Sequence, residues 1–202
     1  MKVLGIYGSP REGGNTEILL DKVLEGARSV GADTYSIYVS KLKISGCIAC
    51  YGCSKTGKCV IKDDMQEVYS LFEEVDIIFL ASPIFFYGVT SQVKALIDRS
   101  QAMWSKRMLK KVTPEKKVTP EQRRIYHSGK GYFISVGATR GKRLFEGASF
   151  TVRYFFDALD MSYEDSLFFK NVEKKGEIKN NIEALDLAFE FGKNAVISDF
   201  RH

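Results

Sequence analysis

The sequence predicts an α/β fold, a doubly wound, five-stranded parallel sheet with helices on both faces. Three observations predict it. Apolar, strand-like runs alternate with segments of helical periodicity along most of the 202 residues. Repeated strand–helix units of this kind build a parallel sheet covered on both sides. A composition that is 45% hydrophobic supplies enough apolar side chains for such a core without disulfide bonds.

Five strands and five helices are expected. The strands are predicted at residues 2–7, 33–39, 76–81, 131–136 and 162–169. The helices are predicted at residues 15–30, 64–74, 88–102, 143–159 and 177–196. We expect one domain over residues 1–202 with the strand order 2-1-3-4-5. That order brings the loops after strands 1, 3 and 4 to one edge of the sheet, where ligands of open α/β sheets bind.

Positive charge is concentrated in one segment, at about residues 104–130. This segment holds nine Lys or Arg and two Glu, an excess larger than the +5 of the whole chain, so the remainder is slightly acidic. A basic excess confined to one segment does not predict a nucleic-acid-binding surface. Residues 110–121 form a tandem KKVTPE repeat, whose prolines and like charges favour an exposed, extended insertion. A role in oligomer contacts or in docking an acidic redox partner is the alternative.

The sequence carries no membrane or export signal. Met1 and Lys2 lead directly into the first predicted strand, without the pattern of a signal peptide. The longest apolar run, residues 77–89, is interrupted by Ser82 and Pro83 and falls short of the roughly 20 residues of a membrane span. We therefore expect a cytoplasmic protein that does not contact the membrane.

A phosphate-binding loop is predicted between the first strand and the first helix. Backbone N–H groups at the start of a helix are unpaired and carry the positive end of its dipole, so they stabilise an anion. Glycines let the backbone approach that anion, and hydroxyl, amide and guanidinium groups can bond to it. The residues expected to do so are Ser9, Arg11, Gly14, Asn15 and Thr16. The loop is neither a Walker A nor a GxGxxG motif, and helix capping by Asn15 or Thr16 is the alternative.

The loops after strands 3 and 4 are predicted to bind a flat ring system. The first supplies apolar and aromatic surface, and the second supplies backbone N–H groups and polar side chains. An aromatic run alone is more often part of a core, and its position after strand 3 carries the functional interpretation. The expected ring-binding residues are Pro83, Ile84, Phe85, Phe86, Tyr87 and Gly88 in the first loop, and Gly137, Ala138, Thr139 and Arg140 in the second.

All four cysteines lie within thirteen residues. Cys47, Cys50, Cys53 and Cys59 are spaced C-x2-C-x2-C-x5-C, in a loop at residues 44–62 that follows strand 2. Disulfides are disfavoured in a reducing compartment, and zinc sites usually have two widely separated C-x2-C pairs. Four soft thiolates in a compact loop favour a [4Fe–4S] cluster, with zinc or metal-free redox thiols as the alternatives.

The motifs GSPREGGNT, SPIFFYGVTSQVKALIDR and VGATRG, with the cysteines between the first two, resemble the iron–sulfur flavoproteins. These are a branch of the NADPH-dependent FMN reductase family with a flavodoxin-like fold. The resemblance implies FMN held by the three loops just described and a [4Fe–4S] cluster held by the four cysteines. It also implies a homo-dimer or homo-tetramer.

The expected function is electron transfer by an oxidoreductase that contains FMN and [4Fe–4S]. The donor would be a one-electron carrier such as ferredoxin, and the acceptor a small two-electron oxidant. Two alternatives are an NAD(P)H-dependent FMN or quinone reductase without a functional cluster, and a non-enzymatic flavodoxin-like electron shuttle. No side chain is expected to act as an acid–base catalyst, because the cofactors carry the chemistry.

Overall fold

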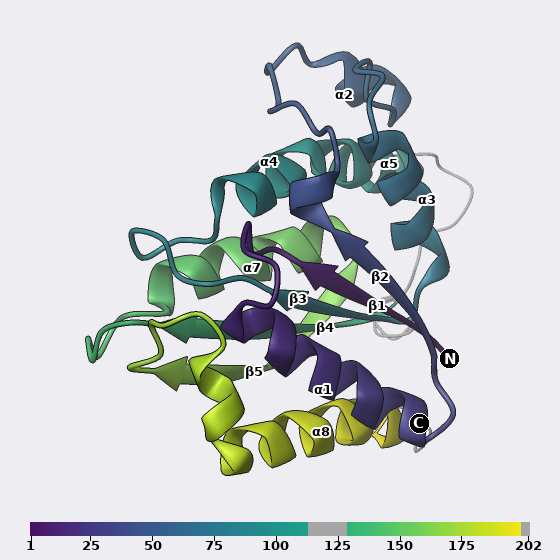
Figure 1. Ribbon diagram of the computed structural model, residues 1–202. Coiled ribbons are helices and arrows are strands. Elements are labelled where there is room, and N and C mark those ends of the chain that lie inside the picture. Colours follow the sequence, from purple (N-terminus) through teal and green to yellow (C-terminus); the bar gives the residue numbers. More distant parts are fainter. Residues whose placement is uncertain (113–128, 199–202) are drawn as a thin grey trace.

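The computed structural model describes residues 1–112 and 129–198, and its centre is a five-stranded parallel sheet (Figure 1). The strands are β1 (Lys2–Tyr7), β2 (Asp33–Tyr38), β3 (Ile77–Ala81), β4 (Gly129–Gly137) and β5 (Met161–Lys170). All four neighbouring pairs are parallel, and the strands lie in the order β2-β1-β3-β4-β5. The predicted fold class and strand order are confirmed.

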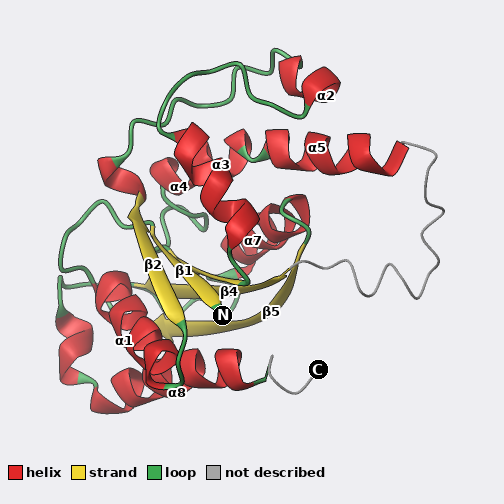
Figure 2. Ribbon diagram, turned by 90° about the vertical axis from the view of Figure 1, so that its right-hand side faces the viewer, coloured by secondary structure: helices red, strands yellow, loops and turns green. Residues whose placement is uncertain are grey.

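Helices cover both faces of the sheet. The α-helices are α1 (Asn15–Ser29), α2 (Gly52–Thr56), α3 (Met65–Glu74), α4 (Ser91–Arg99), α5 (Gln101–Val112), α7 (Glu146–Ala158) and α8 (Ile182–Ile197). Two short 3-10 turns, η1 (Val39–Lys41) and η2 (Glu177–Asn180), follow β2 and precede α8. Helices α1 and α8 lie on one face, and α3, α4 and α7 lie on the other (Figures 1 and 2). None of the helices in the described part of the chain is long and apolar enough to cross a membrane.

The sheet separates two hydrophobic cores, because successive side chains of a strand point to opposite faces. On β1, Val3 and Tyr7 pack in the core beneath α1 and α8. Leu4 and Ile6 pack in the core with α3, α4 and α7. Central strands buried on both sides explain why β1 and β3 read as almost continuous apolar runs.

Two glycines let α1 and α8 touch at their backbones. A Cβ on Gly26 would lie 1.9 Å from the carbonyl oxygen of Phe189, and one on Gly192 would lie 1.9 Å from that of Val23. Neither position has room for a side chain. This close contact fixes the spacing between α1 and α8.

The segment after α4 differs from the prediction. Helix α4 begins only at Ser91, because Thr90 caps it by accepting a hydrogen bond from Val93 N. The residues that open the charged segment form helix α5, which the sequence did not predict. Two of its cations pair with acidic residues distant in sequence: Lys106 pairs with Glu73, and Arg107 pairs with Asp157 and Asp160. Residues 113–121, most of the KKVTPE repeat, lie outside the described residues.

Helix α8 starts later than predicted. Asn181 Oδ1 accepts from Ala184 N (3.0 Å) and caps the helix, so it begins at Ile182. The preceding residues form η2 instead. Short helix α2, which contains Cys53, was also not predicted, because a five-residue helix leaves no periodic signal in the sequence.

Candidate functional site

A chain of buried hydrogen bonds joins the loop that follows β1, the loop that follows β3 and strand β4. Thr90 Oγ1 donates to the carbonyl oxygen of Gly8 (2.7 Å), and Thr90 N donates to Ser82 Oγ (3.2 Å). Ser135 Oγ donates to the carbonyl oxygen of Ser82 (2.7 Å). Thr90, Ser82 and Ser135 are fully buried. The loops after β1 and β3 are therefore held to each other and to the last residues of β4 at the carboxyl edge of the sheet, where a site of this fold lies.

The loop after β1 curls tightly into the N-terminus of α1. Gly13 has a φ of +63°, which favours glycine, and Gly14 is the N-cap of the helix. A Cβ on Gly14 would lie 3.1 Å from the carbonyl oxygen of Arg11 and 3.2 Å from Ser9 Oγ. The first N–H groups of a helix have no partner within it, so the start of α1 can offer donors to an anion. The N–H of Gly13 donates to Glu17 Oε2 (2.8 Å), so this donor is already engaged.

Of the residues predicted to bind phosphate, Arg11 is exposed, whereas Asn15 and Thr16 are buried. The side chain of Asn15 is already engaged: Nδ2 donates to the carbonyl oxygen of Lys174 (2.9 Å), and Oδ1 accepts from Ile178 N (3.1 Å). Asn15 thus fastens the loop after β5 over the start of α1. Its main-chain N–H, not its side chain, is what it can offer to an anion.

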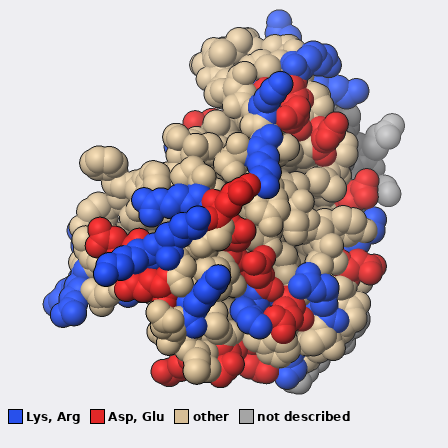
Figure 3. Space-filling model, viewed as in Figure 1, with Lys and Arg blue, Asp and Glu red and all other residues tan. Residues whose placement is uncertain are grey.

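Lys175 is a candidate anion-binding residue that the sequence analysis missed. Asn15 holds its loop in place, and Lys175 Cε lies 3.5 Å from the position that a Cβ on Gly13 would occupy. The signal was present as the pair Lys174–Lys175 in the loop after the last strand. Figure 3 shows Lys and Arg side chains crowding the side of this face toward which the strands point, with Asp and Glu side chains between them.

The loop after β3 forms a tight turn that presents aromatic rings to solvent. Phe85 and Gly88 exchange two backbone hydrogen bonds of 2.9 Å each. The two residues between them, Phe86 and Tyr87, have φ values of +49° and +61°. This left-handed conformation is strained for bulky residues by about 1–2 kcal/mol each. Strain of this kind gathers at ligand sites, and the Phe86 ring is fully exposed.

The loop after β4 lies against this turn. The hydroxyl of Tyr87 approaches Gly141, where an added Cβ would lie 3.3 Å from it, and a Cβ on Gly147 would lie 2.6 Å from the Tyr87 carbonyl oxygen. Arg140 Nε donates to Asn171 Oδ1 (2.9 Å), which ties the same loop to the end of β5. Ala138 and Thr139 are exposed. The structure therefore brings the two predicted ring-binding loops side by side.

The cysteine loop lies above α4 and α5, away from the sheet (Figure 1). Cys47 and Cys50 are exposed, whereas Cys53 and Cys59 are partly buried. Ser105 Oγ donates to Cys53 Sγ at 3.6 Å. Ala49 and Tyr51, between the first three cysteines, have φ values of +52° and +57°. The chain reverses sharply there, as a compact wrapping loop must.

The donor chemistry of this loop suits an iron–sulfur cluster, but its sulfurs are not gathered. Four thiols are soft ligands in the number that a closed cluster needs. Within residues 1–112 and 129–198, however, no group of three or more His, Cys, Asp or Glu side chains is placed to hold a metal ion. The cysteines would have to draw together to bind one.

Arg99 of α4 anchors both ends of the cysteine loop. Its buried guanidinium donates to the carbonyl oxygen of Ser45 (2.9 Å) on one side and to both carboxylate oxygens of Asp63 (2.7 and 3.0 Å) on the other. Cys59 lies against Arg99 and Tyr69. Burial opposes the charge of Arg99, but its hydrogen bonds to Asp63 and Cys59 hold its pKa above the ordinary value. The hydrogen bond from Arg99 lowers the pKa of Asp63 below its ordinary value.

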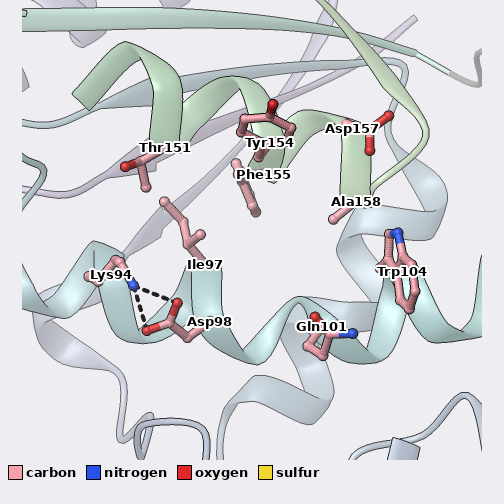
Figure 4. A pocket seen from close by; sticks show the side chains of 10 residues that line it. All are labelled: Lys94, Ile97, Asp98, Gln101, Trp104, Thr151, Tyr154, Phe155, Asp157 and Ala158. Atoms are coloured by element: carbon pink, nitrogen blue, oxygen red, sulfur yellow. Dashed lines mark hydrogen bonds and ion pairs between the residues drawn. The ribbon is translucent and has the colours of Figure 1, made fainter. Parts of the chain in front are cut away.

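A separate hollow of about 400 Å³ lies between α4, α5 and α7 (Figure 4). Its lining comes from these helices and includes Trp104 of α5 and Tyr154 of α7. Lys94 and Asp98 on its rim pair with each other at 2.6 Å. None of the predicted cofactor-binding residues lines it, so it is not part of the site at the sheet edge.

Comparison with known proteins decides the family. The family model described as NADPH-dependent FMN reductase matches residues 1–162. The chain belongs to this family. An iron–sulfur flavoprotein of Archaeoglobus fulgidus is 42% identical over 99 residues, and one of Methanocaldococcus jannaschii is 42% identical over 103 residues. These matches cover 49% and 51% of this chain, and the chain spans about half the length of these relatives, 45% and 53%.

A solved flavone reductase superposes with a TM-score of 0.72 and 20% identity, covering 100% of this chain and 65% of that one. This likeness shows the shared fold. The predicted relationship to the iron–sulfur flavoproteins within the FMN reductase family is confirmed. The family membership also agrees with the predicted oxidoreductase class.

Proposed function

We propose that this chain is an FMN-dependent oxidoreductase whose cofactor lies across the loops after β1, β3 and β4. The observation that carries the proposal is the buried hydrogen-bond chain through Ser82, Thr90 and Ser135, which holds the loops after β1 and β3 together at the end of β4. The turn after β3 in turn lies against Gly141 of the loop after β4. Family membership supports the same cofactor. When bound, FMN supplies the transfer of one or two electrons.

The phosphate of FMN would bind at the N-terminus of α1. The donors are the main-chain N–H groups around Gly14 and Thr16 and the Ser9 hydroxyl, with Arg11 and Lys175 contributing positive charge. An anion at a helix N-terminus gains from both the unpaired donors and the helix dipole. Asn15 would act by fastening the loop of Lys175 over this site.

The ring system would lie against the turn of residues 83–88 and the loop of residues 137–140. Phe85, Phe86 and Tyr87 expose aromatic surface, and ring stacking favours a planar ligand there. Ala138, Thr139 and Arg140 offer polar groups to its edge. These residues bind and orient the ring, and Arg140 is itself held by Asn171.

The four cysteines are proposed to hold a [4Fe–4S] cluster. Their number, softness and spacing support it, as do the names of the iron–sulfur relatives. Arg99, Asp63 and Ser45 would keep the loop ends in place while the sulfurs draw together. The one-electron donor would be ferredoxin or a similar carrier, the chain would act as a homo-dimer or homo-tetramer, and the cytoplasm is its proposed location.

A second candidate is an NAD(P)H-dependent FMN or quinone reductase in which the cysteines hold no cluster. The observation that favours it is the open arrangement of the four sulfurs. Both candidates share the flavin site, and they differ in metal content and in electron donor.

The test is anaerobic purification followed by measurement of FMN, iron, acid-labile sulfide and zinc per chain. One FMN with close to four irons and four sulfides supports the main proposal. FMN without iron, even after reconstitution with iron and sulfide, selects the second candidate. A chain that retains no FMN overturns both. Anaerobic reduction by NADPH, NADH or reduced ferredoxin then identifies the donor.

A further inference from the structure

A second hollow lies on the face of the sheet that α7 covers, between α7 and the edge strand β5. Its volume is about 560 Å³, within the range of small-molecule sites. Helix α7 contributes residues 146, 149, 150 and 153, which are spaced along one face of a helix. Strand β5 contributes Phe168 and Lys170, and the loop before α7 contributes Lys142 and Phe145.

The floor of this hollow is aromatic and rigid. The rings of Phe145 and Phe168 are stacked, with centroids 4.4 Å apart and planes inclined by 13°. Phe168 also makes an edge contact with Phe133, which is fully buried in the core. Phe150 stands beside them with 60% of its surface exposed. An apolar floor of aromatic rings with an exposed ring at its side suits a planar aromatic ligand.

The rim of the hollow is positively charged. Lys142, Arg153 and Lys170 line it, and Glu146 is the one carboxylate in the lining. Glu146 is already paired with Arg143 Nε at 2.6 Å. Among the described residues, no ion pair engages Lys142, Arg153 or Lys170, although the Arg153 guanidinium lies over the Tyr163 ring, 5.7 Å from its centroid. An anionic group on a ligand would therefore meet three cations that have no carboxylate partner.

We propose that this hollow binds a planar aromatic anion, such as an aromatic carboxylate or sulfonate. The hollow opens beside the proposed flavin loops, because Lys142 directly follows Gly141 and Lys170 directly precedes Asn171, the partner of Arg140. A bound aromatic anion could also serve as the electron acceptor of the flavin, and that role rests on the proposed function. The binding of the anion is independent of it.

The test is calorimetric titration of the purified protein with anthraquinone-2-sulfonate. The matched ligand is 2-(hydroxymethyl)anthraquinone, which has the same ring system without the charge. We expect one sulfonate per chain, bound roughly 10-fold more tightly than the uncharged ligand, with an affinity that falls as salt is added. Equal affinities for the two ligands would overturn the proposal.

Variants locate the site. Lys170→Gln and Arg153→Gln should each weaken sulfonate binding by roughly 3- to 5-fold, the effect of one exposed charge. Lys22→Gln makes the same change on α1, away from the hollow, and should leave the affinity unaltered. Phe150→Ala should weaken both ligands by about the same factor, because it removes a ring and no charge. An effect of Lys22→Gln as large as that of Lys170→Gln would refute the location.

The FMN content of each preparation separates this proposal from the proposed function. If the protein does not retain FMN but its variants show the expected affinities, the anion site is supported and the proposed FMN-dependent function is overturned. If the protein retains FMN but binds the two anthraquinones equally well, the proposed function is supported and the anion site is overturned.

Discussion

Replacing Arg99 by methionine should destabilise the protein by about 3 kcal/mol. Arg99 is fully buried and joins Ser45 and Asp63, two points 18 residues apart at the ends of the cysteine loop. Removing one partner of a buried ion pair typically costs about 3–5 kcal/mol, because the other charge is left uncompensated. The lower end applies here, since Asp63 keeps hydrogen bonds from Ser45 N (3.0 Å) and Met65 N (3.2 Å).

The free energy of unfolding is measured by urea denaturation of Arg99→Met against the unmodified protein. Arg143→Met is the control, because this arginine also pairs with a carboxylate but is 81% exposed, and it should change stability by less than about 0.5 kcal/mol. Tryptic cleavage at the exposed Lys55 and Lys58 should accelerate in Arg99→Met only. A loss below about 1 kcal/mol with an unchanged cleavage rate would refute the anchoring role.

Three further changes test the fold and the site. Gly192→Ala should destabilise the protein by about 3 kcal/mol in urea, since its Cβ would lie 1.9 Å from a carbonyl oxygen, whereas Gly46→Ala, with nothing within 4 Å, should have almost no effect. Equal effects would contradict the close helix contact. Phe86→Gly should stabilise the fold by about 0.5 kcal/mol, because relief of positive-φ strain exceeds the entropy cost of glycine, and should weaken FMN binding. A clear drop in melting temperature would count against a strained turn. The pKa of Asp63 is lowered in the folded protein, so the stabilisation by its carboxylate is present above the ordinary pKa of about 3.9 and is lost as the pH falls below it. Asp63→Asn should therefore flatten the dependence of the unfolding free energy on pH over that acid range. An unchanged slope in Asp63→Asn would show that Asp63 does not contribute.

The sheet and the approximate positions of its loops were predictable because they depend on local patterns. Strand β1 runs from Lys2 to Tyr7, as predicted, since an apolar run buried on both faces is unambiguous once turn residues follow it. The start of α1 at Asn15 was predictable because two glycines precede apolar residues at helical spacing. Placing the loops at the carboxyl edge then followed from the parallel topology alone.

Contacts between distant residues were not predictable. The bonds of Asn15 to Lys174 and Ile178 join positions about 160 residues apart, and nothing in the phosphate-loop motif indicates them. Helix α5 was missed because its lysines and arginines read as a solvated run, whereas acidic residues elsewhere in the chain compensate Lys106 and Arg107.

Backbone conformation at two positions also departed from what the residue types suggest. Phe86 and Tyr87 adopt a left-handed turn that usually contains Asn or Gly, so no local signal marked it.

The cysteine spacing indicated a cluster, but spacing alone does not determine whether the four sulfurs converge, and in the described structure they do not.

The central claim, that the loop after β1 binds the phosphate of a flavin, is tested most directly by comparing FMN with riboflavin. The two ligands share the same ring and ribityl chain and differ only in the phosphate. Fluorescence titration of the FMN-free chain should give FMN an affinity roughly 100-fold higher, from charge-assisted hydrogen bonds and the dipole of α1. Equal affinity for FMN and riboflavin would contradict the account.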